Sequence, residues 1–142
     1  MATFKWQRVE HRSSAVVLRF GVLALTLSTA AIHASLGGFL FTMNAIGYTA
    51  LALAMIVPGP LARVRWLVRL ALVGFTLATI GGWLLVGARF PLAYVDKALE
   101  LALVAFVVLD LQVSDGGPNA VAGRSRELLN SLVRGFAARL RP

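Results

Sequence analysis

The sequence contains no cysteine, so disulfides, thiolate metal sites and thiol nucleophiles are excluded. Only 14% of its residues are charged, whereas a soluble globular domain has about 25%. It also lacks a serine nucleophile elbow, a phosphate-binding loop and an HExxH motif. Because these signatures of common enzymes are missing, we expect a protein that is not an enzyme.

Histidine is scarce as well, since His11 and His33 are the only two in the sequence. A bis-histidine haem needs one histidine from each of two facing helices. The two histidines here fall on opposite sides of the predicted membrane, and no zinc-binding motif surrounds His33. We therefore expect no cofactor and no bound metal ion.

Hydrophobic residues make up 58% of the 142 residues, and the mean hydropathy is +0.79. A chain of this length forms one domain. Its apolar residues gather in four runs, each close to the roughly 20 residues that cross a bilayer as a helix. The sequence therefore predicts an all-α fold: a transmembrane four-helix bundle followed by a C-terminal amphipathic cytoplasmic helix. The predicted spans are about 15–35, 39–57, 67–88 and 92–113.

Glycine and proline mark the breaks between these spans. Gly37-Gly38 separates the first two, and Pro58-Gly59-Pro60 ends the second because proline cannot continue the helical hydrogen bonds. Pro91 suits the first position of the fourth helix. Within the third span, small residues at four-residue spacing form a face that allows close packing of another helix. These residues are Gly74, Ala78 and Gly82.

Residues 1–14 form a basic cytoplasmic segment before the first span, with Ser13 and Ser14 as candidate N-caps. A signal peptide is the alternative. Its apolar core is only about 7–15 residues long, however, so we expect the first helix to be retained.

Basic residues are distributed very unevenly between the two predicted sides of the membrane. Of the 14 Lys and Arg residues, only Arg89 and Lys97 fall on the side opposite the termini. Cytoplasmic segments of membrane proteins carry the excess of positive charge. We therefore expect a multi-pass protein of a bacterial cell membrane, with both termini in the cytoplasm.

The chain is predicted to end with a linker, residues 114–123, and a basic amphipathic helix, residues 124–142. Its apolar stripe consists of Leu129, Leu132, Val133, Phe136 and Leu140. Its arginines off that stripe are Arg126, Arg134, Arg139 and Arg141. Such a helix lies on the anionic cytoplasmic leaflet or packs on the cytoplasmic end of the bundle, and both interpretations stay open.

Charged residues on the fourth span match polar residues on the first. Asp96 and Asp110 are as far apart along their helix as Arg19 and His33 are along theirs, about 21 Å in each case. The two helices run antiparallel, so we predict a structural ion pair of Arg19 with Asp110 and a contact of His33 with Asp96. Arg69 is a competing partner for Asp110.

A second set of polar residues is predicted to gather in the outer half of the bundle. Its members are His33, Asn44, Tyr48, Asp96, Lys97 and Glu100. Hydrogen bonds among such residues fix the register of transmembrane helices. Ionisable groups inside a membrane also mark sites for protons and ions. Glu100 lies deepest, so it is the candidate for binding a proton or cation.

The stretch IHASLGGFLFTMNAIGY, residues 32–48, resembles uncharacterised small bacterial integral membrane proteins with four spans. The resemblance covers the first two spans and implies no activity and no site residue. We expect a non-enzymatic accessory or assembly component. The alternative is a proton- or cation-coupled small transporter or channel that acts as a homo-oligomer through Glu100. The expected partners are the lipid bilayer and a second copy or another membrane protein, and no nucleic acid.

Overall fold

The computed structural model describes residues 3–59 and 64–139, and no strand occurs in this part of the chain. The predicted all-helical class is therefore confirmed. The described residues form five helices. These are α1 (Thr3–Leu36), α2 (Phe39–Ile56), α4 (Arg65–Val86), α5 (Pro91–Asp115) and α6 (Gly117–Arg139).

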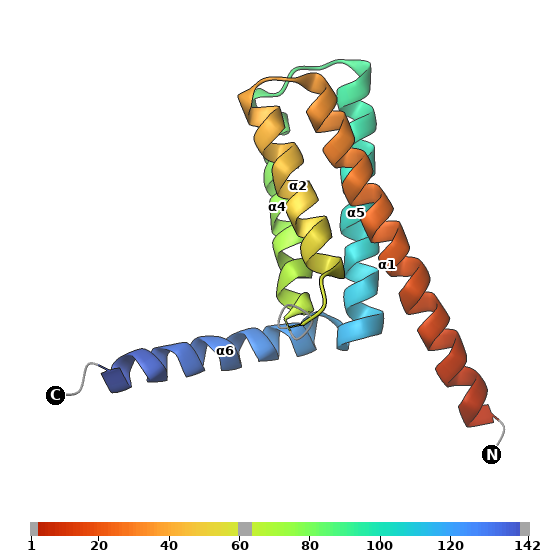
Figure 1. Cartoon of the computed structure of the whole chain (residues 1–142), viewed down its shortest axis with the longest axis vertical. Helices are drawn as coiled ribbons and strands as arrows, with labels where there is room; N and C mark the ends of the chain where they lie inside the picture. Colours follow the sequence, from red (N-terminus) through yellow and green to blue (C-terminus); the bar gives the residue numbers. More distant parts are fainter. Residues whose placement is uncertain (1–2, 60–63, 140–142) are drawn as a thin grey trace.

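Helices α1, α2, α4 and α5 alternate in direction and form an up-and-down bundle (Figure 1). Helix α1 packs against α2 and α5, and α4 packs against the same two helices, so the four close into a ring. Both ends of the described chain therefore lie at one end of the bundle, called the lower end here. The upper end carries the α1–α2 and α4–α5 turns (Figure 1).

Three of the helices are long and apolar enough to cross a membrane: α1 from Ser14 to Leu36, α2 and α4. Their mean hydropathies are 2.0, 1.7 and 1.7, which indicates a membrane protein. Helix α5 is 25 residues long but more polar. Its charged residues are Asp96, Lys97, Glu100, Asp110 and Asp115.

Two predicted features are wrong: the N-caps Ser13 and Ser14, and the linker. Helix α1 is continuous from Thr3, so no N-cap separates residues 3–14 from the apolar stretch, which begins at Ser14, close to the predicted residue 15. Residues 3–14 contain no glycine or proline, and several are good helix formers, so the helix continues without a break. The predicted linker 114–123 is also mostly helical. Gly116, in the left-handed conformation at φ 81°, ends α5, and α6 begins at Gly117.

Glycines allow close contacts on two sides of the ring. A Cβ atom on Gly21 of α1 would lie 2.6 Å from the ring of Phe106 on α5. One on Gly47 of α2 would lie 2.5 Å from the ring of Phe75 on α4. The aromatic rings therefore occupy the space that larger residues would need, and helices rich in such contacts pack closely.

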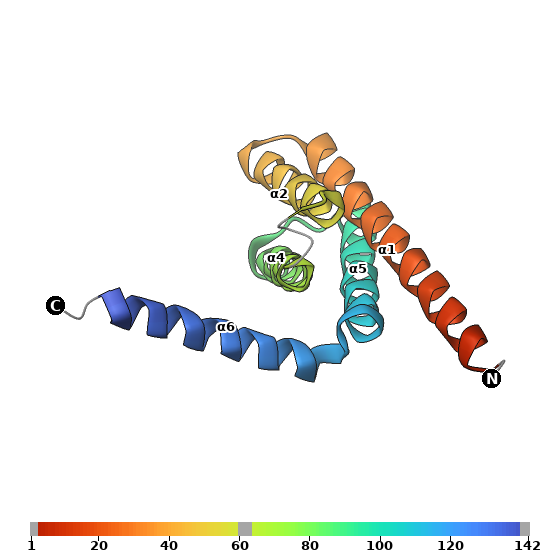
Figure 2. The same cartoon turned by 60° about the horizontal axis from the view of Figure 1, so that its bottom comes forward.

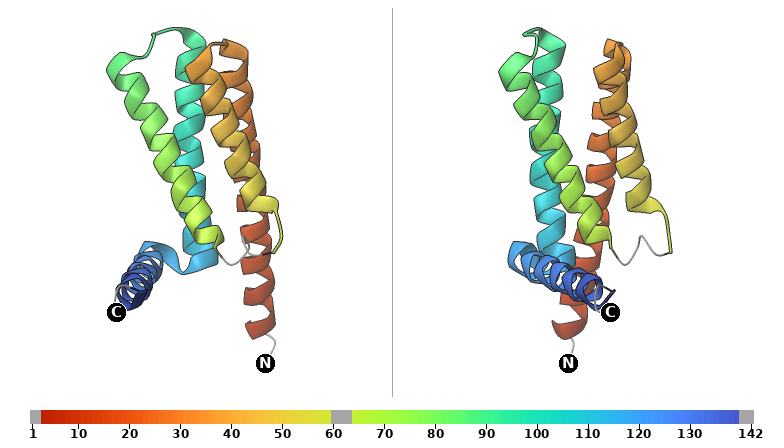
Figure 3. Two further views of the ribbon diagram at one scale, coloured as in Figure 1. Left: turned by 60° about the vertical axis from the view of Figure 1, so that its left-hand side comes forward. Right: turned by 90° about the vertical axis from the view of Figure 1, so that its left-hand side faces the viewer.

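Helix α6 leaves the lower end of the bundle and runs across its long axis (Figures 1 and 2). Only its root is part of the core, where Val121 is buried. Further along, Leu129, Leu132 and Phe136 are each more than 60% exposed. Figure 3 shows the same arrangement from two further sides.

Candidate functional site

Four helices bring polar side chains together near the upper end of the bundle. This upper cluster consists of His33 from α1, Tyr48 from α2, Thr79 from α4, and Asp96, Lys97 and Glu100 from α5. Except for the half-buried Thr79, each residue is at most 8% exposed. The three residues of α5 lie within about one helical turn, so they share the buried face of that helix.

Glu100 is the centre of the upper cluster. Its Oε1 accepts hydrogen bonds from the Tyr48 hydroxyl at 2.9 Å and the Thr79 hydroxyl at 2.8 Å. The two hydroxyl oxygens are themselves 2.9 Å apart. The Thr79 hydroxyl also lies 2.7 Å from the backbone oxygen of Thr76, so its single proton is shared between two acceptors. Such a network can accept a further proton or another positive charge.

Lys97 joins the two carboxylates of the upper cluster. Its Nζ lies 2.6 Å from Glu100 Oε2 and 2.9 Å from Asp96 Oδ2. One ammonium is therefore held between two carboxylates, and only 10% of its side chain is exposed. Lys97 therefore lies in the bundle interior and does not extend to the surface.

His33 completes the upper cluster. Its Nδ1 lies 3.0 Å from the backbone oxygen of Thr29; because a carbonyl can only accept, Nδ1 carries a proton and donates it. The other nitrogen, Nε2, lies 3.9 Å from Glu100 Oε1. In a neutral ring this nitrogen has a free lone pair. The space between Nε2 and Oε1 is therefore suited to a proton or a cation.

Asp96 carries an unusual oxygen. Its Oδ1 lies 3.5 Å from His33 Nδ1, but that proton is used by the Thr29 carbonyl. Oδ1 is buried and has no hydrogen-bond partner in the described chain. A buried acceptor without a partner costs about 1–3 kcal/mol, so the site is chemically incomplete.

The charges of the upper cluster do not balance. Asp96 and Glu100 contribute two negative charges, and Lys97 contributes one positive charge. Those three side chains therefore carry a formal charge of −1, and the His33 imidazole, whose Nε2 lies 3.9 Å from Glu100 Oε1, is the neighbouring group that can hold a compensating proton. Uncompensated charge is costly in a membrane interior, so one further positive charge would stabilise it.

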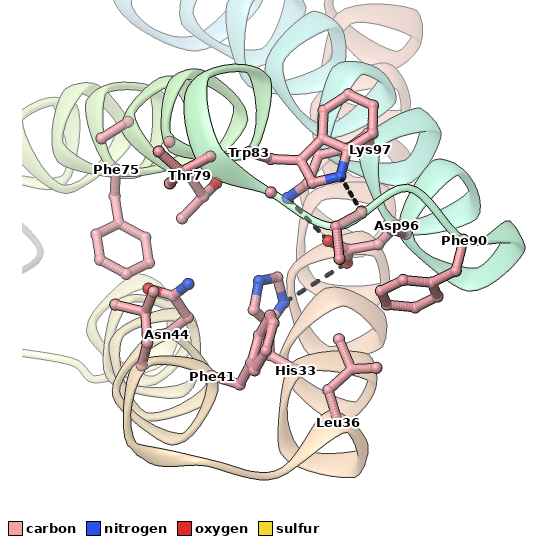
Figure 4. A pocket seen from close by; sticks show the side chains of 17 residues that line it. His33, Leu36, Phe41, Asn44, Phe75, Thr79, Trp83, Phe90, Asp96 and Lys97 are labelled. Carbon is pink, nitrogen blue, oxygen red and sulfur yellow. Dashed lines mark hydrogen bonds and ion pairs between the residues drawn. The ribbon is translucent and has the colours of Figure 1, made fainter.

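A cavity of about 350 Å³ adjoins the upper cluster (Figure 4). Asp96, Lys97 and His33 form its polar wall. The aromatic rings around it belong to Phe41, Phe75, Trp83 and Phe90. The cavity continues to residues 86–88 in the α4–α5 turn, so it reaches the upper end of the bundle.

The small residues of the third span, Gly74, Ala78 and Gly82, form a face that permits close packing of another helix. In the described chain, Ala78 and Gly82 line the cavity and are exposed. A Cβ atom added to Gly74 or Gly82 would meet no atom within 4 Å. No described helix covers this face, and its small side chains leave the cavity wide.

The structure brings five of the six predicted outer-half residues into contact: His33, Tyr48, Asp96, Lys97 and Glu100. Asn44 lies at the cavity instead, on the wall opposite Trp83 (Figure 4). The sequence reasoning missed Thr79. Its position on α4 follows a helical step from Thr76, but only the packing of α4 against α5 places it beside Glu100.

A lower cluster holds charges at the opposite end. Arg69 Nε lies 2.6 Å from Asp110 Oδ2, and Arg69 Nη1 lies 2.8 Å from Asp115 Oδ2. Arg124 reaches Asp115 from α6 at 3.3 Å. The predicted pair Arg19–Asp110 is 3.9 Å apart, and the Arg19 side chain is 43% exposed. Arg69 is thus the closer partner of Asp110, because it is buried on the adjacent α4.

His33, Asp96 and Glu100 place one ligand atom each within 4.8 Å of one another, so they could hold a metal ion. Lys97, however, already bonds a carboxylate oxygen of both acids. A divalent ion would have to compete with this ammonium at close range, and a monovalent cation or a proton fits the charge count better.

No protein-family model, no curated protein and no solved structure matches this chain, so the site is interpreted from its own geometry.

Proposed function

We propose that the protein is a non-enzymatic, four-span protein of a bacterial cell membrane, with both termini in the cytoplasm. Helix α5 is the fourth span, since its length suffices and its charges face the bundle interior. The positive-inside distribution supports the orientation. The resemblance of residues 32–48 to small bacterial four-span proteins agrees with it. The upper end of the bundle is then the outer end.

We further propose that the upper cluster binds a proton or a small cation on its way through a small transporter or channel, with Glu100 as the binding residue. The single observation that carries this proposal is that two buried carboxylates, those of Asp96 and Glu100, share one ammonium, that of Lys97, beside the His33 imidazole. Glu100 Oε1 and His33 Nε2 are the groups between which the charge is held.

Access to the site supports binding from the outer side. The cavity connects the cluster with the upper turns. Below the cluster, Leu72, Leu103 and Val107 are completely buried and form an apolar layer. This layer separates the upper cluster from the lower one. In the proposed transporter, this arrangement corresponds to a conformation that is open toward the upper end of the bundle.

The test is proton uptake into proteoliposomes that contain a pH-sensitive dye, driven by a potassium diffusion potential. We expect the wild type to acidify the lumen. Glu100→Gln keeps the hydrogen-bonding shape but removes the exchangeable charge, so we expect normal folding and about a tenfold or greater loss of rate. Glu100→Leu removes both and should also lower the yield of folded protein.

The matched control is Glu127→Gln, because Glu127 is an exposed acid on α6. This variant should transport at the wild-type rate. If Glu100→Gln also transports at that rate, or if the correctly inserted wild type gives no uptake of protons or of an added monovalent cation, the proposed function is wrong and the upper cluster only holds the helices in register.

A second candidate is an accessory component that binds the anionic cytoplasmic leaflet through α6. The observation in its favour is a helical row on α6. Val121 is buried against the bundle, Ser125 is half-buried, and Leu128 and Leu132 continue the row outward with increasing exposure. One side of α6 therefore has two environments. Near Val121 it faces the bundle, and toward Leu132 the same side faces the surrounding bilayer. Basic residues beside such an apolar row bind anionic lipid.

The absence of cysteine makes this candidate easy to test. The variants Leu132→Cys and Arg134→Cys are each labelled with a spin label and placed in nanodiscs with or without anionic lipid. We expect the Leu132 label to lie in lipid and the Arg134 label in water, with the difference larger in anionic nanodiscs. Equal water exposure of both labels would rule out this position for α6.

A further inference from the structure

The lining of the cavity beside the upper cluster combines aromatic rings with a few polar groups. Rings come from α2, α4 and the α4–α5 turn: those of Phe41, Phe75, Trp83 and Phe90. The polar lining residues are His33, Asn44, Thr79, Asp96 and Lys97. Figure 4 shows the rings around the space and Asp96 at its edge. Cavities of this size with few polar groups bind small molecules of matching polarity.

We infer that this cavity binds a lipophilic amine: an aryl or alkyl group with one primary ammonium head. This inference rests on the proposed function: the ammonium head brings positive charge to the same cluster, at Asp96, beside the space between Glu100 Oε1 and His33 Nε2 where the proton or small cation is held. The aryl or alkyl group lies among the aromatic rings, and the ammonium lies at Asp96. The aromatic wall adds cation–π attraction for the head.

The hydrogen bonds of Asp96 select for a donor. Asp96 is 2% exposed, lines the cavity, and has no hydrogen-bond partner for Oδ1. Its other oxygen is bonded by Lys97 at 2.9 Å. A ligand that donates a hydrogen bond to Oδ1 supplies the partner that this oxygen lacks, after a small rotation of the Asp96 side chain. A ligand that has only acceptors leaves Oδ1 without a partner.

The charges select for a cation. An ammonium head cancels the excess negative charge of the cluster, whereas an alcohol satisfies Oδ1 without doing so. An anion is disfavoured, because the only cationic head in the cavity wall, that of Lys97, is already bonded to Asp96 and Glu100. A quaternary ammonium has the charge but no hydrogen to donate.

Glycine at position 82 keeps the cavity wide. An added Cβ at Gly82 meets nothing within 4 Å, and the residue lines the cavity. Its neighbour Gly81 is equally free of contacts but does not line the cavity. The two positions therefore form a matched pair. A leucine at position 82 fills the cavity, and a leucine at position 81 does not.

The experiment measures binding of 4-phenylbutylamine to the full-length protein in nanodiscs by calorimetry, with empty nanodiscs subtracted. Two comparison ligands are 4-phenylbutanol and the N,N,N-trimethyl derivative of the amine. We expect the amine to bind about tenfold or more tightly than either, which corresponds to about 1.4 kcal/mol. Equal affinity of the alcohol or of the quaternary ammonium overturns the inference.

The variants locate the site. We expect Gly82→Leu and Asp96→Asn each to weaken amine binding about tenfold or more, and Gly81→Leu to leave it unchanged. Thermal unfolding and gel filtration establish that each variant is folded. If Gly82→Leu is folded and still binds the amine with wild-type affinity, the amine does not occupy this cavity and the inference is wrong.

Failure of this inference is distinguishable from failure of the proposed function. If the amine does not bind while proton or monovalent-cation uptake still depends on Glu100, the cluster binds a smaller ion and only the lipophilic-amine inference is wrong. If the amine binds as expected but no uptake depends on Glu100, the cavity is a binding site without coupled transport.

Discussion

The molecule buries charged side chains at both ends of its bundle, and the two groups differ in how their charges are balanced. In the lower cluster, the buried Arg69 bonds Asp110 and Asp115, and the partly exposed Arg19 and Arg124 lie at their edges. Three cations thus face two anions. In the upper cluster one ammonium faces two carboxylates.

The chemical groups differ as well. A guanidinium is planar, permanently charged and directional, so it fixes two carboxylates in a rigid geometry. The upper cluster instead combines an imidazole, two hydroxyls and a lysine, which can exchange or redistribute protons. The comparison suggests that the lower cluster is a structural joint between α4, α5 and α6. The upper cluster, beside its cavity, is the place where an ion or ligand can enter and leave.

The largest loss of stability is expected from a substitution in the lower cluster. Arg69→Leu leaves Asp110 buried without its closest partner, and removal of one member of a buried pair costs about 3–5 kcal/mol. Arg19→Leu is the matched control; its exposed, more distant guanidinium should contribute less than about 1 kcal/mol. Unfolding in mixed micelles of increasing SDS content measures both. Equal losses would mean that Arg19 and Arg69 share the role, as the sequence had predicted for Arg19.

A smaller effect is expected in the upper cluster. Tyr48→Phe removes one of the two hydroxyls bonded to Glu100 Oε1. Hydrogen bonds between membrane helices contribute about 1 kcal/mol, so the same unfolding assay should show a loss of that size. Tyr94→Phe is the control, because Tyr94 is 54% exposed. A loss as large as that of Arg69→Leu would contradict the difference drawn between the two clusters.

Much of the fold followed from helical periodicity. The helical spacing of Asp96, Glu100, Leu103, Val107 and Asp110 along α5 predicts one shared face, and all five residues are buried. The contact of α1 with α5 was also predicted, from the equal spacing of polar residues on two antiparallel helices. These predictions succeeded because a helix fixes the angle and the rise between its residues.

Other features depended on packing between helices. The position of α4 in the ring determines that Arg69 is the arginine that bonds Asp110. The same position brings Thr79 to Glu100. The face of Gly74, Ala78 and Gly82 permitted two outcomes, close packing or an open wall. Only the arrangement of neighbouring helices decides between them, because a small side chain allows contact but does not supply it.

By itself, the sequence determined that this chain is helical, that three of its helices suit a membrane, and which face of α5 is polar. Composition and periodicity are enough for such properties, since they concern one helix at a time. The tertiary structure decided that Tyr48 and Thr79 reach Glu100, that Asp96 keeps one oxygen without a partner, and that a cavity opens beside them. Those properties depend on the distances between side chains that belong to different helices. The sequence of one helix does not determine these distances.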